Sequence, residues 1–251
     1  MPLNYMQIFE QRGTSHADAF RLYPRAMVQE VGAVLDLAGL QPGDIILDMP
    51  SASGFLHDSI TVPNVRYIAV DPSARMHSIC KSKITEAYCA PMNCLPLAQA
   101  CIDVIICLAG LHHEANCLGI FQEMNRVLKP IGRLAISEVD KGSAVAHFLN
   151  DFVNAHSATG HDGKFVDNHF MGLLDEAKFD IQVNQSAHYH WEFDSADKMA
   201  QCFQLMFGID RASEQEIIQA VEEVLGVDKN ADGKYLVRWS MRHILARPNI
   251  T

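Results

Sequence analysis

Two acidic residues, Asp48 and Asp71, each end a short apolar stretch and lie 23 residues apart. After Asp48 and Met49 come the small or rigid residues PSASG, at positions 50–54. In a doubly wound α/β sheet, ligands bind beyond the carboxyl ends of the strands, and an acid ending the second strand can bind the two hydroxyls of an adenosine ribose. The pattern therefore predicts a crevice in which a nucleoside lies against bare backbone.

The loop after Asp48 is poorly suited to a pyrophosphate. A dinucleotide fingerprint uses three glycines to present free N–H groups to the phosphates. Here Pro50 has no N–H, and Ala52 carries a Cβ where the fingerprint has none. S-adenosylmethionine has no phosphate, so we expect it as the cofactor and we disfavour a nicotinamide dehydrogenase.

Three histidines could supply a base near neutral pH, where imidazole titrates. His112 and His113 follow a predicted strand at 101–108, and His161 lies in the segment GHDGKF. One of the three could take a proton from a methyl acceptor held at this edge of the sheet. The alternative for His112 and His113 is a packed, hydrogen-bonded structural role.

The elements that must position these residues alternate along the chain. Short runs rich in β-branched residues predict buried strands, and helical patterns separate them. Alternation of this kind indicates βαβ crossovers and a mostly parallel sheet. Two late segments could form an antiparallel edge. The expected strands are residues 44–49, 66–71, 101–108, 132–139, 180–193 and 234–248.

Five segments, in order, resemble the class I S-adenosylmethionine-dependent methyltransferases, especially the small-molecule branch of methyltransferase type 11. They are ILDMPSASG, YIAVDPSARM, MNCLPLAQACIDVIICLAGLHH, FQEMNRVLKPIGRLAISE and LLDEAKFDI, within residues 40–185. The resemblance implies an α/β fold, Rossmann-like and doubly wound. Its sheet would have seven strands, mostly parallel with an antiparallel last strand, under a helical cap.

The resemblance also assigns roles to single residues. Asp48 would organise the loop near the methionine amine, and Asp71 would bind the ribose. Two departures are Pro50 and Ala52, which replace motif glycines, and a third is Pro91, where many relatives hold the adenine amine with an acid. Two alternatives stay open: Asp48 as a brace for its loop, and Asp71 as a helix N-cap before Pro72. The implied cofactor-binding residues are Asp48, Pro50, Ser51, Ala52, Gly54, Asp71, Pro72, Met92, Asn93 and Leu108.

We expect residues 1–36 to form an N-terminal helical cap segment and residues 37–251 to form the cofactor-binding domain. Insertions at about 141–178 and 195–226 would complete the cap over the substrate. The expected function is that of an S-adenosylmethionine-dependent methyltransferase (EC 2.1.1 type) acting on a small molecule. The alternative keeps the fold but drops methyl transfer, as in a cyclase, a decarboxylase or a non-catalytic regulatory subunit.

Composition limits the partners. The formal net charge is -10 and no basic run is present, which disfavours nucleic acid. The longest apolar run, residues 104–111, is too short to span a membrane, and seven cysteines without a C-x-x-C pair indicate a reducing cytoplasm. We expect no metal, because Cys107 lies on a buried strand and the calcium-like loop starting at Asp228 has Trp239 at its twelfth position.

Overall fold

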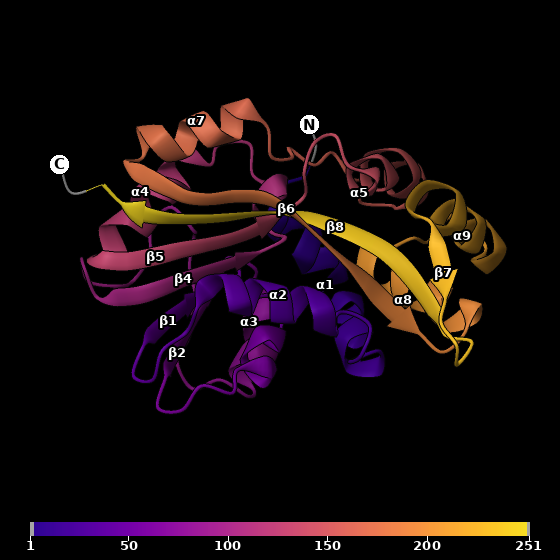
Figure 1. Cartoon of the computed structure of the whole chain (residues 1–251), viewed down its shortest axis with the longest axis horizontal. Helices are drawn as coiled ribbons and strands as arrows, with labels where there is room; N and C mark the ends of the chain where they lie inside the picture. Colours follow the sequence, from indigo (N-terminus) through magenta and orange to yellow (C-terminus); the bar gives the residue numbers. More distant parts are fainter. Residues whose placement is uncertain (1–2, 250–251) are drawn as a thin grey trace.

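The computed structural model describes residues 3–249, and its centre is one eight-stranded sheet (Figure 1). The strand order is β3-β2-β1-β4-β5-β8-β6, and β7 pairs with β8 outside this path. Strands β1 to β5 pair in parallel, whereas β8 runs antiparallel to both β5 and β6. The strands are β1 (Ile45–Asp48), β2 (Arg66–Asp71), β3 (Ala87–Cys89), β4 (Ile102–Leu108), β5 (Leu128–Glu138), β6 (Phe179–Phe193), β7 (Val227–Lys229) and β8 (Tyr235–Pro248).

This topology confirms the doubly wound α/β fold and its antiparallel last strand. The seven strands of the expected sheet are the seven on the main path, and the short β7 adds an eighth. The two late strands pair as expected, but β6 forms the edge because β8 inserts between β5 and β6. The winding reverses between β1 and β4, and in such sheets ligands bind beyond the carboxyl ends of these strands.

The helices begin and end where local chemistry directs them. Asn4 and Gln7 form a capping box at the start of α1, and Gly39 ends α2 with a φ of 57°. The helices are α1 (Tyr5–Leu22), α2 (Val28–Ala38), α3 (Ala74–Lys81), α4 (Leu118–Val127), α5 (Ala144–His147), α6 (Asn154–His156), α7 (Asn168–Glu176), α8 (Ala196–Phe207) and α9 (Glu214–Ala220). The other helical segments are the 3₁₀ turns η1 (Phe55–Ser59) and η2 (Leu111–His113) and the π-helical turns η3 (Phe148–Val153) and η4 (Val221–Leu225).

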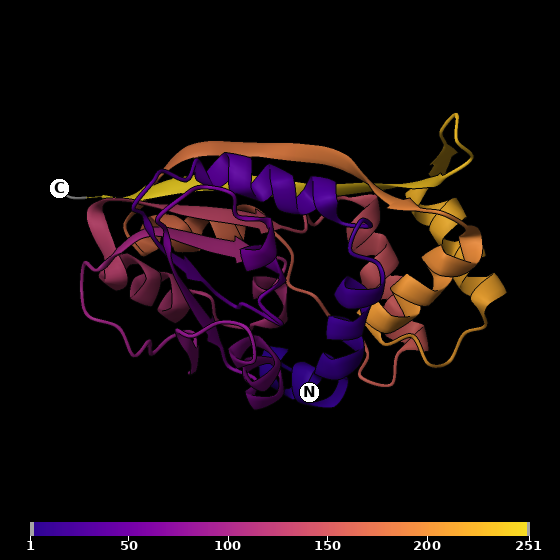
Figure 2. The same cartoon turned by 90° about the horizontal axis from the view of Figure 1, so that it is seen from below.

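The molecule has a sheet half and a cap half (Figures 1 and 2). Helices α2, α3, α4 and α7 cover the sheet, whose buried strands carry two apolar clusters. The cap half has its own core, in which α5, η3, α8 and α9 pack on the far ends of β6 and β8. These two strands pair from Phe179 to Phe193 with one register shift between Ile181 and Val183, so one two-stranded ribbon joins the halves.

Helix α1 lies between the two halves and contacts α3 on one side and α8 on the other (Figure 2). Arg12 fixes this position by donating a hydrogen bond to the carbonyl of Met206 in α8. Because of this placement, α1 covers the carboxyl edge of the sheet.

Two sequence interpretations concern other parts of the chain. The calcium-like segment is a polar turn, because Asp228 pairs with Arg238 and the Asn230 side chain accepts from the backbone of Asp232 and Lys234. Within residues 3–249, every helix is too short or too polar to cross a bilayer.

Candidate active site

The loop after β1 keeps the conformation of a glycine-rich turn despite its substitutions. Ala52 adopts a φ of 47°, in the left-handed region that favours glycine, and its N–H donates to Asp71 Oδ2 at 2.8 Å. Pro50 follows a cis peptide bond, and its ring packs closely on Gly110, where an added Cβ would lie 2.2 Å from Pro50 Cγ. The loop is therefore bound tightly to the ends of β2 and β4.

Asp71 ends β2 as expected, but groups of the protein itself satisfy its carboxylate. It accepts from the Tyr5 hydroxyl at 2.9 Å, from the Ala52 N–H and from the Ser73 N–H, and only 1% of the residue is exposed. Burial raises the pKa of Asp71 to about 7, against the lowering effect of these hydrogen bonds. The acid is thus covered by α1, which holds Tyr5.

The alternative role of Asp71 as a helix N-cap is wrong. Helix α3 begins at Ala74, and Ser73 is its N-cap, with a side chain that accepts from Met76 N–H. Pro72 therefore precedes the cap. Asp71 instead anchors the Ser73 N–H and the loop of Ala52, which gives it a bracing role in this conformation.

Asp48 is also a brace in this conformation. It is 3% exposed, and it accepts a hydrogen bond from the Tyr67 hydroxyl of the neighbouring strand. Burial raises its pKa to about 7. Gly54 has a φ of 71°, in the left-handed region that favours glycine, and a Cβ there would also lie 2.5 Å from Ile84 Cδ1.

The remaining cofactor candidates are spread along the crevice. Ser51 is 2% exposed, and its hydroxyl faces Cys80 Sγ at 3.9 Å. Met92 is buried, Asn93 is exposed, and Leu108 is half-buried at the end of β4. Cys107 is fully buried in the sheet core, as the sequence indicates.

A largely apolar cavity lies beside this loop, between the sheet, α1 and the cap. The cavity extends from the loop after β1 to the cap. Residues at the ends of β1 and β4 line one side of it, and aromatic residues of β6, α8 and β8 line the other. Its lining residues include Tyr5, Phe9, Arg12, His16, Phe20, Glu30, Pro50, Ala52, Phe55, Leu108, Ala109, His112, His113, Leu149, His161, Trp191, Met206, Phe207, Trp239 and Met241.

Several polar groups on this cavity lack partners. Within residues 3–249, Arg12 Nε, His16 Nδ1 and Trp239 Nε1 are buried without a hydrogen bond. No carboxylate of the described chain pairs with Arg12, and burial lowers its pKa to about 10, so it stays cationic at neutral pH. Buried polar atoms in proteins are nearly always hydrogen-bonded, so these three atoms suit a ligand.

Glu30 supplies an acid to the same cavity. Trp191 Nε1 donates to its Oε2 at 2.7 Å, and burial raises its pKa to about 8. Glu30 is therefore mostly protonated at neutral pH, which leaves Arg12 as the charged group on this wall.

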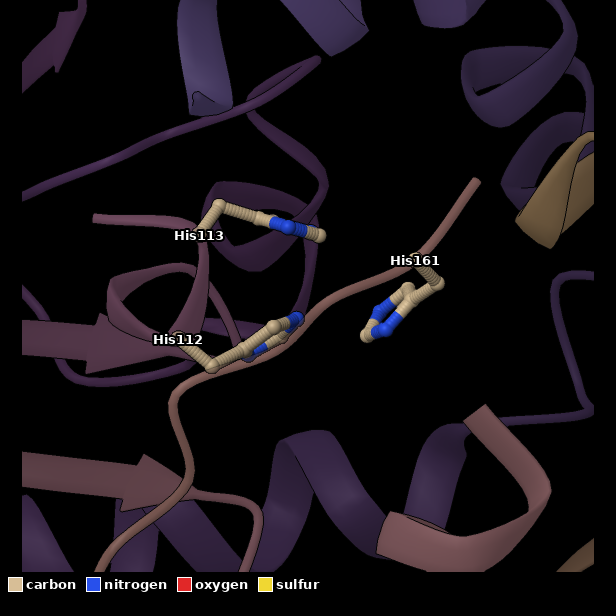
Figure 3. A group of neighbouring side chains, drawn as sticks. All are labelled: His112, His113 and His161. Atoms are coloured by element: carbon tan, nitrogen blue, oxygen red, sulfur yellow. The ribbon is translucent and has the colours of Figure 1, made fainter. Parts of the chain in front are cut away.

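The three histidines predicted from the sequence come together on the cavity wall (Figure 3). Their ring centroids lie 4.1 Å apart for His112 and His113, 5.3 Å for His112 and His161, and 5.0 Å for His113 and His161. Each residue is 8% exposed or less. Burial, followed by the neighbouring charges, lowers the pKa of His113 and of His161 well below the usual value.

Two of these rings are oriented by neighbours. Glu138 Oε1 lies 2.6 Å from His112 Nδ1, and Asn150 Oδ1 lies 3.0 Å from His161 Nδ1. Burial raises the pKa of Glu138, but the charge and hydrogen bond of His112 and two backbone donors lower it more, to a net value below the usual one. Glu138 is therefore a carboxylate at neutral pH.

Sequence reasoning missed the groups that α1 and β5 bring to the site. Tyr5, Phe9, Arg12, His16 and Phe20 recur every three or four residues, so they share one face of a helix. That spacing was a usable signal for a ligand-facing helix. Glu138 was also visible as an acid at the end of a buried strand, like Asp48 and Asp71.

Residues 47–136 match a family model described as a methyltransferase domain. Among curated proteins, an arsenite methyltransferase of Halobacterium salinarum is 30% identical over 157 residues, 57% of this chain and 39% of that protein. The chain spans about half or less of the length of the curated relatives it matches first.

Solved structures agree on the fold. An S-adenosylmethionine-dependent methyltransferase from Thermotoga maritima, described as a possible histamine N-methyltransferase, has a TM-score of 0.65 at 15% identity, over 97% of this chain and 99% of that one. The [4+2]-cyclase SpnF has a TM-score of 0.66 at 14% identity, over 100% and 98% of the two chains. Residues 47–136 thus resemble a methyltransferase domain, and the described chain has the fold of the class I methyltransferases. The expected family resemblance is thereby confirmed, and the cofactor of this family is S-adenosylmethionine.

The residue types of the crevice fit that cofactor, although α1 covers part of it. Asp71 ends β2, the bare loop at Ser51 and Ala52 lies beside it, and the cavity begins at Pro50 and Ala52. The Tyr5 hydroxyl makes with Asp71 the kind of bond that a ribose hydroxyl makes with an acid. Access of a nucleoside to Asp71 therefore requires α1 to release Tyr5.

Proposed function

We propose that the protein transfers a methyl group from S-adenosylmethionine to a small-molecule acceptor bound in the cavity. One observation carries the proposal: the loop after β1, the end of β4 and three histidines line a single cavity. Methyl transfer needs a cofactor and an acceptor held face to face, away from water. This cavity is the place in the described chain where cofactor-loop residues meet groups able to take a proton.

Each residue then has a proposed role. Asp71 would bind the ribose once Tyr5 has left it, while Ser51, Ala52 and Gly54 would shape the methionine end. Met92 and Asn93 would flank the adenine, and Asp48, Pro50, Pro72 and Leu108 would hold the loops around the cofactor. When bound, the cofactor supplies a methyl group on a sulfonium, which an acceptor takes by displacement.

The acceptor side is proposed from the cavity wall. Trp191, Trp239 and Phe207 would pack on an apolar or aromatic acceptor, and Arg12 would attract an anionic group of it. His112, His113 or His161 would take the proton that the acceptor loses. The segments from 141–178 and 195–226 contribute Leu149, His161 and Met206 to this wall, which supports their proposed role as a cap.

A thermal-shift experiment tests the cofactor. At about a hundred times its dissociation constant, S-adenosylmethionine or S-adenosylhomocysteine should stabilise the fold by about 2.7 kcal/mol, which raises the melting temperature by about 5 to 10 °C. Isotope-labelled methyl transfer to a pool of small metabolites then tests the reaction. No shift with either nucleoside would end the cofactor proposal.

A second candidate is an S-adenosylmethionine-fold protein without methyl transfer, such as a cyclase. One observation favours it: Asp71, the acid that should bind the ribose, already accepts three hydrogen bonds within the protein and is 1% exposed. The similarity in fold to the cyclase SpnF is consistent with such a use of the architecture. A thermal shift without any labelled methyl product would favour this candidate over the first.

A further inference from the structure

We propose that His112, His113 and His161 form a binding site for a divalent transition-metal ion, with Zn²⁺ as the expected occupant. One ring nitrogen from each residue can be chosen so that all three lie within 4.8 Å of one another (Figure 3). Three imidazoles with a fourth position open are a common ligand set of catalytic zinc. The sequence alone does not predict this site, because His161 lies 48 residues beyond His113.

The nitrogens are close to the spacing that a metal requires. A Zn–N bond of about 2.0–2.1 Å in tetrahedral geometry places ligand nitrogens about 3.4 Å apart, so nitrogens now up to 4.8 Å apart would draw together by up to about 1.4 Å. His161 sits on a loop after Gly160, and side-chain rotation on this loop can supply such a movement. The site therefore needs small adjustment and no change of fold.

Hydrogen bonds fix which nitrogen is free on two of the rings. Asn150 Oδ1 already accepts from Gly163 N–H at 2.8 Å, so it is an acceptor for His161 Nδ1 as well. The Glu138 carboxylate likewise accepts from His112 Nδ1. Each ring then carries its proton on Nδ1 and presents the lone pair of Nε2.

Such partners are typical of metal-binding histidines. In known sites the ring N–H that faces away from the metal donates to a carboxylate, a carbonyl or water, which fixes the tautomer and the ring orientation. Glu138 fits this role closely, because it is 0% exposed and is itself held by the Leu111 and Val139 N–H groups. His113 makes no hydrogen bond to the described residues, so its ring is free to bind.

The open position would face the cavity, and this gives the inference a chemical consequence. Together with the proposed function, a metal here would hold an oxygen of the acceptor, lower the pKa of that oxygen and replace the histidines as the activating group. Arg12 lies on the same cavity and would add attraction for an anionic oxygen ligand. The acceptor class that this site fits is a small molecule with an ionisable hydroxyl.

Metal binding can be measured without any cofactor or activity. The protein, free of any histidine tag, is stripped with a chelator, and Zn²⁺ uptake is followed by calorimetry and elemental analysis. Co²⁺ is then substituted and its visible spectrum recorded, because low-coordinate Co²⁺ absorbs far more strongly than the octahedral ion. We expect one ion per chain and a low-coordinate spectrum.

Variants locate the site. His161→Gln should weaken Zn²⁺ binding by more than about 100-fold. Asn150→Ala removes the partner that orients His161 and two hydrogen bonds to Gly163, and should weaken binding by about 10- to 100-fold. His188→Gln, an exposed histidine on β6 away from the cavity, is the matched control and should bind as the wild type does. Melting curves with chelator present show which variants are folded.

Two results would overturn the metal site. One is a folded wild-type protein that takes up no Zn²⁺, and the other is equal uptake by the wild type and by folded His161→Gln. Neither result bears on the cofactor, because the shift with S-adenosylmethionine is measured separately in chelator. A cofactor shift without metal uptake would leave the proposed function standing with histidine as the base.

Discussion

The two ends of the crevice differ in how completely the protein satisfies its own polar groups. At the Asp71 end, three donors from α1, the β1 loop and the α3 cap satisfy the carboxylate. At the cavity end, Arg12 Nε, His16 Nδ1 and Trp239 Nε1 are buried without partners. The same helix, α1, provides Tyr5 to the satisfied end and Arg12 and His16 to the unsatisfied end.

The Asp71 end is therefore closed to a ligand in this conformation, whereas the cavity end has polar groups ready to bind one. An unpartnered buried polar group costs about 1–3 kcal/mol, so the cavity end loses free energy unless a ligand restores the bonds. The Asp71 end has the opposite balance, because a ligand must displace a bond that already exists. Binding at the cavity end should therefore precede, or accompany, release of Tyr5 from Asp71.

The largest expected effect is at the satisfied end. Asp71→Ala removes three hydrogen bonds and leaves the Ala52 N–H unpaired, so it should lower the free energy of unfolding by about 3 kcal/mol. Urea denaturation measures this loss, and cofactor binding should vanish as well. Asp58→Ala, on the exposed turn η1, is the control and should change stability far less. Stability near that of the wild type would show that Asp71 is not a brace.

A smaller effect, dependent on pH, is expected at the cavity end. The pKa of Glu30 is raised by burial from 4.5 to about 8, so the native protein keeps this proton where the unfolded chain has lost it. Its contribution to stability is full below about pH 4.5 and is lost as the pH rises toward 8. Glu30→Gln, whose amide oxygen can still accept from Trp191, should lack this loss.

The measurement is the difference in unfolding free energy between Glu30→Gln and the wild type. Between about pH 6 and 7.5 the stability of the variant relative to the wild type should rise by about 2 kcal/mol, since one pKa unit corresponds to about 1.4 kcal/mol. Glu222→Gln, at an exposed position, provides the control and should show no such trend. A difference that is constant with pH would mean that Glu30 is ionised in the native state.

The smallest effects form a matched pair on α1. Tyr5→Phe removes the bond to Asp71 and should cost about 1 kcal/mol of stability, while tightening cofactor binding by up to about tenfold because no phenol competes. His16→Phe removes an unpartnered nitrogen from a ring packed on Phe9 and Phe20. The free energy of unfolding should stay the same or rise by up to about 1 kcal/mol. If Tyr5→Phe and His16→Phe changed the melting temperature by the same amount in the same direction, the two ends would not differ as proposed.

The fold was predictable because most of its strands are recognisable from their local sequence. The runs that form β1, β2 and β4 are almost continuously apolar, as strands buried on both faces must be. Strand β3 was missed because Ala87–Cys89 is too short for any periodicity to show. The position of β8 between β5 and β6 is a matter of pairing, which local pattern does not specify.

The sequence supplied candidate residues for the site but not the conformation in which they lie. Asp71, His112 and His113 were proposed from their places directly after predicted strands, where the edge of a parallel sheet gathers ligands. The periodicity of α1 shows an amphipathic helix, but which surface it covers depends on tertiary packing against α3 and α8. The approach of His161 to His112 depends on hydrogen bonds from its loop to Asn150 and Asn154, which no spacing in the sequence encodes.

The ribbon of β6 and β8 restricts how this molecule can open. Trp191 and Trp239, which form part of the cavity wall, belong to the same two strands that complete the sheet beside β5. A hinge between sheet and cap would have to bend paired backbone, whereas α1 packs on α3 and α8 and is not part of the sheet. Movement of α1 should therefore control the entry and exit of ligands at the cavity. A covalent cross-link that held α1 in place should slow the release of a ligand already bound there.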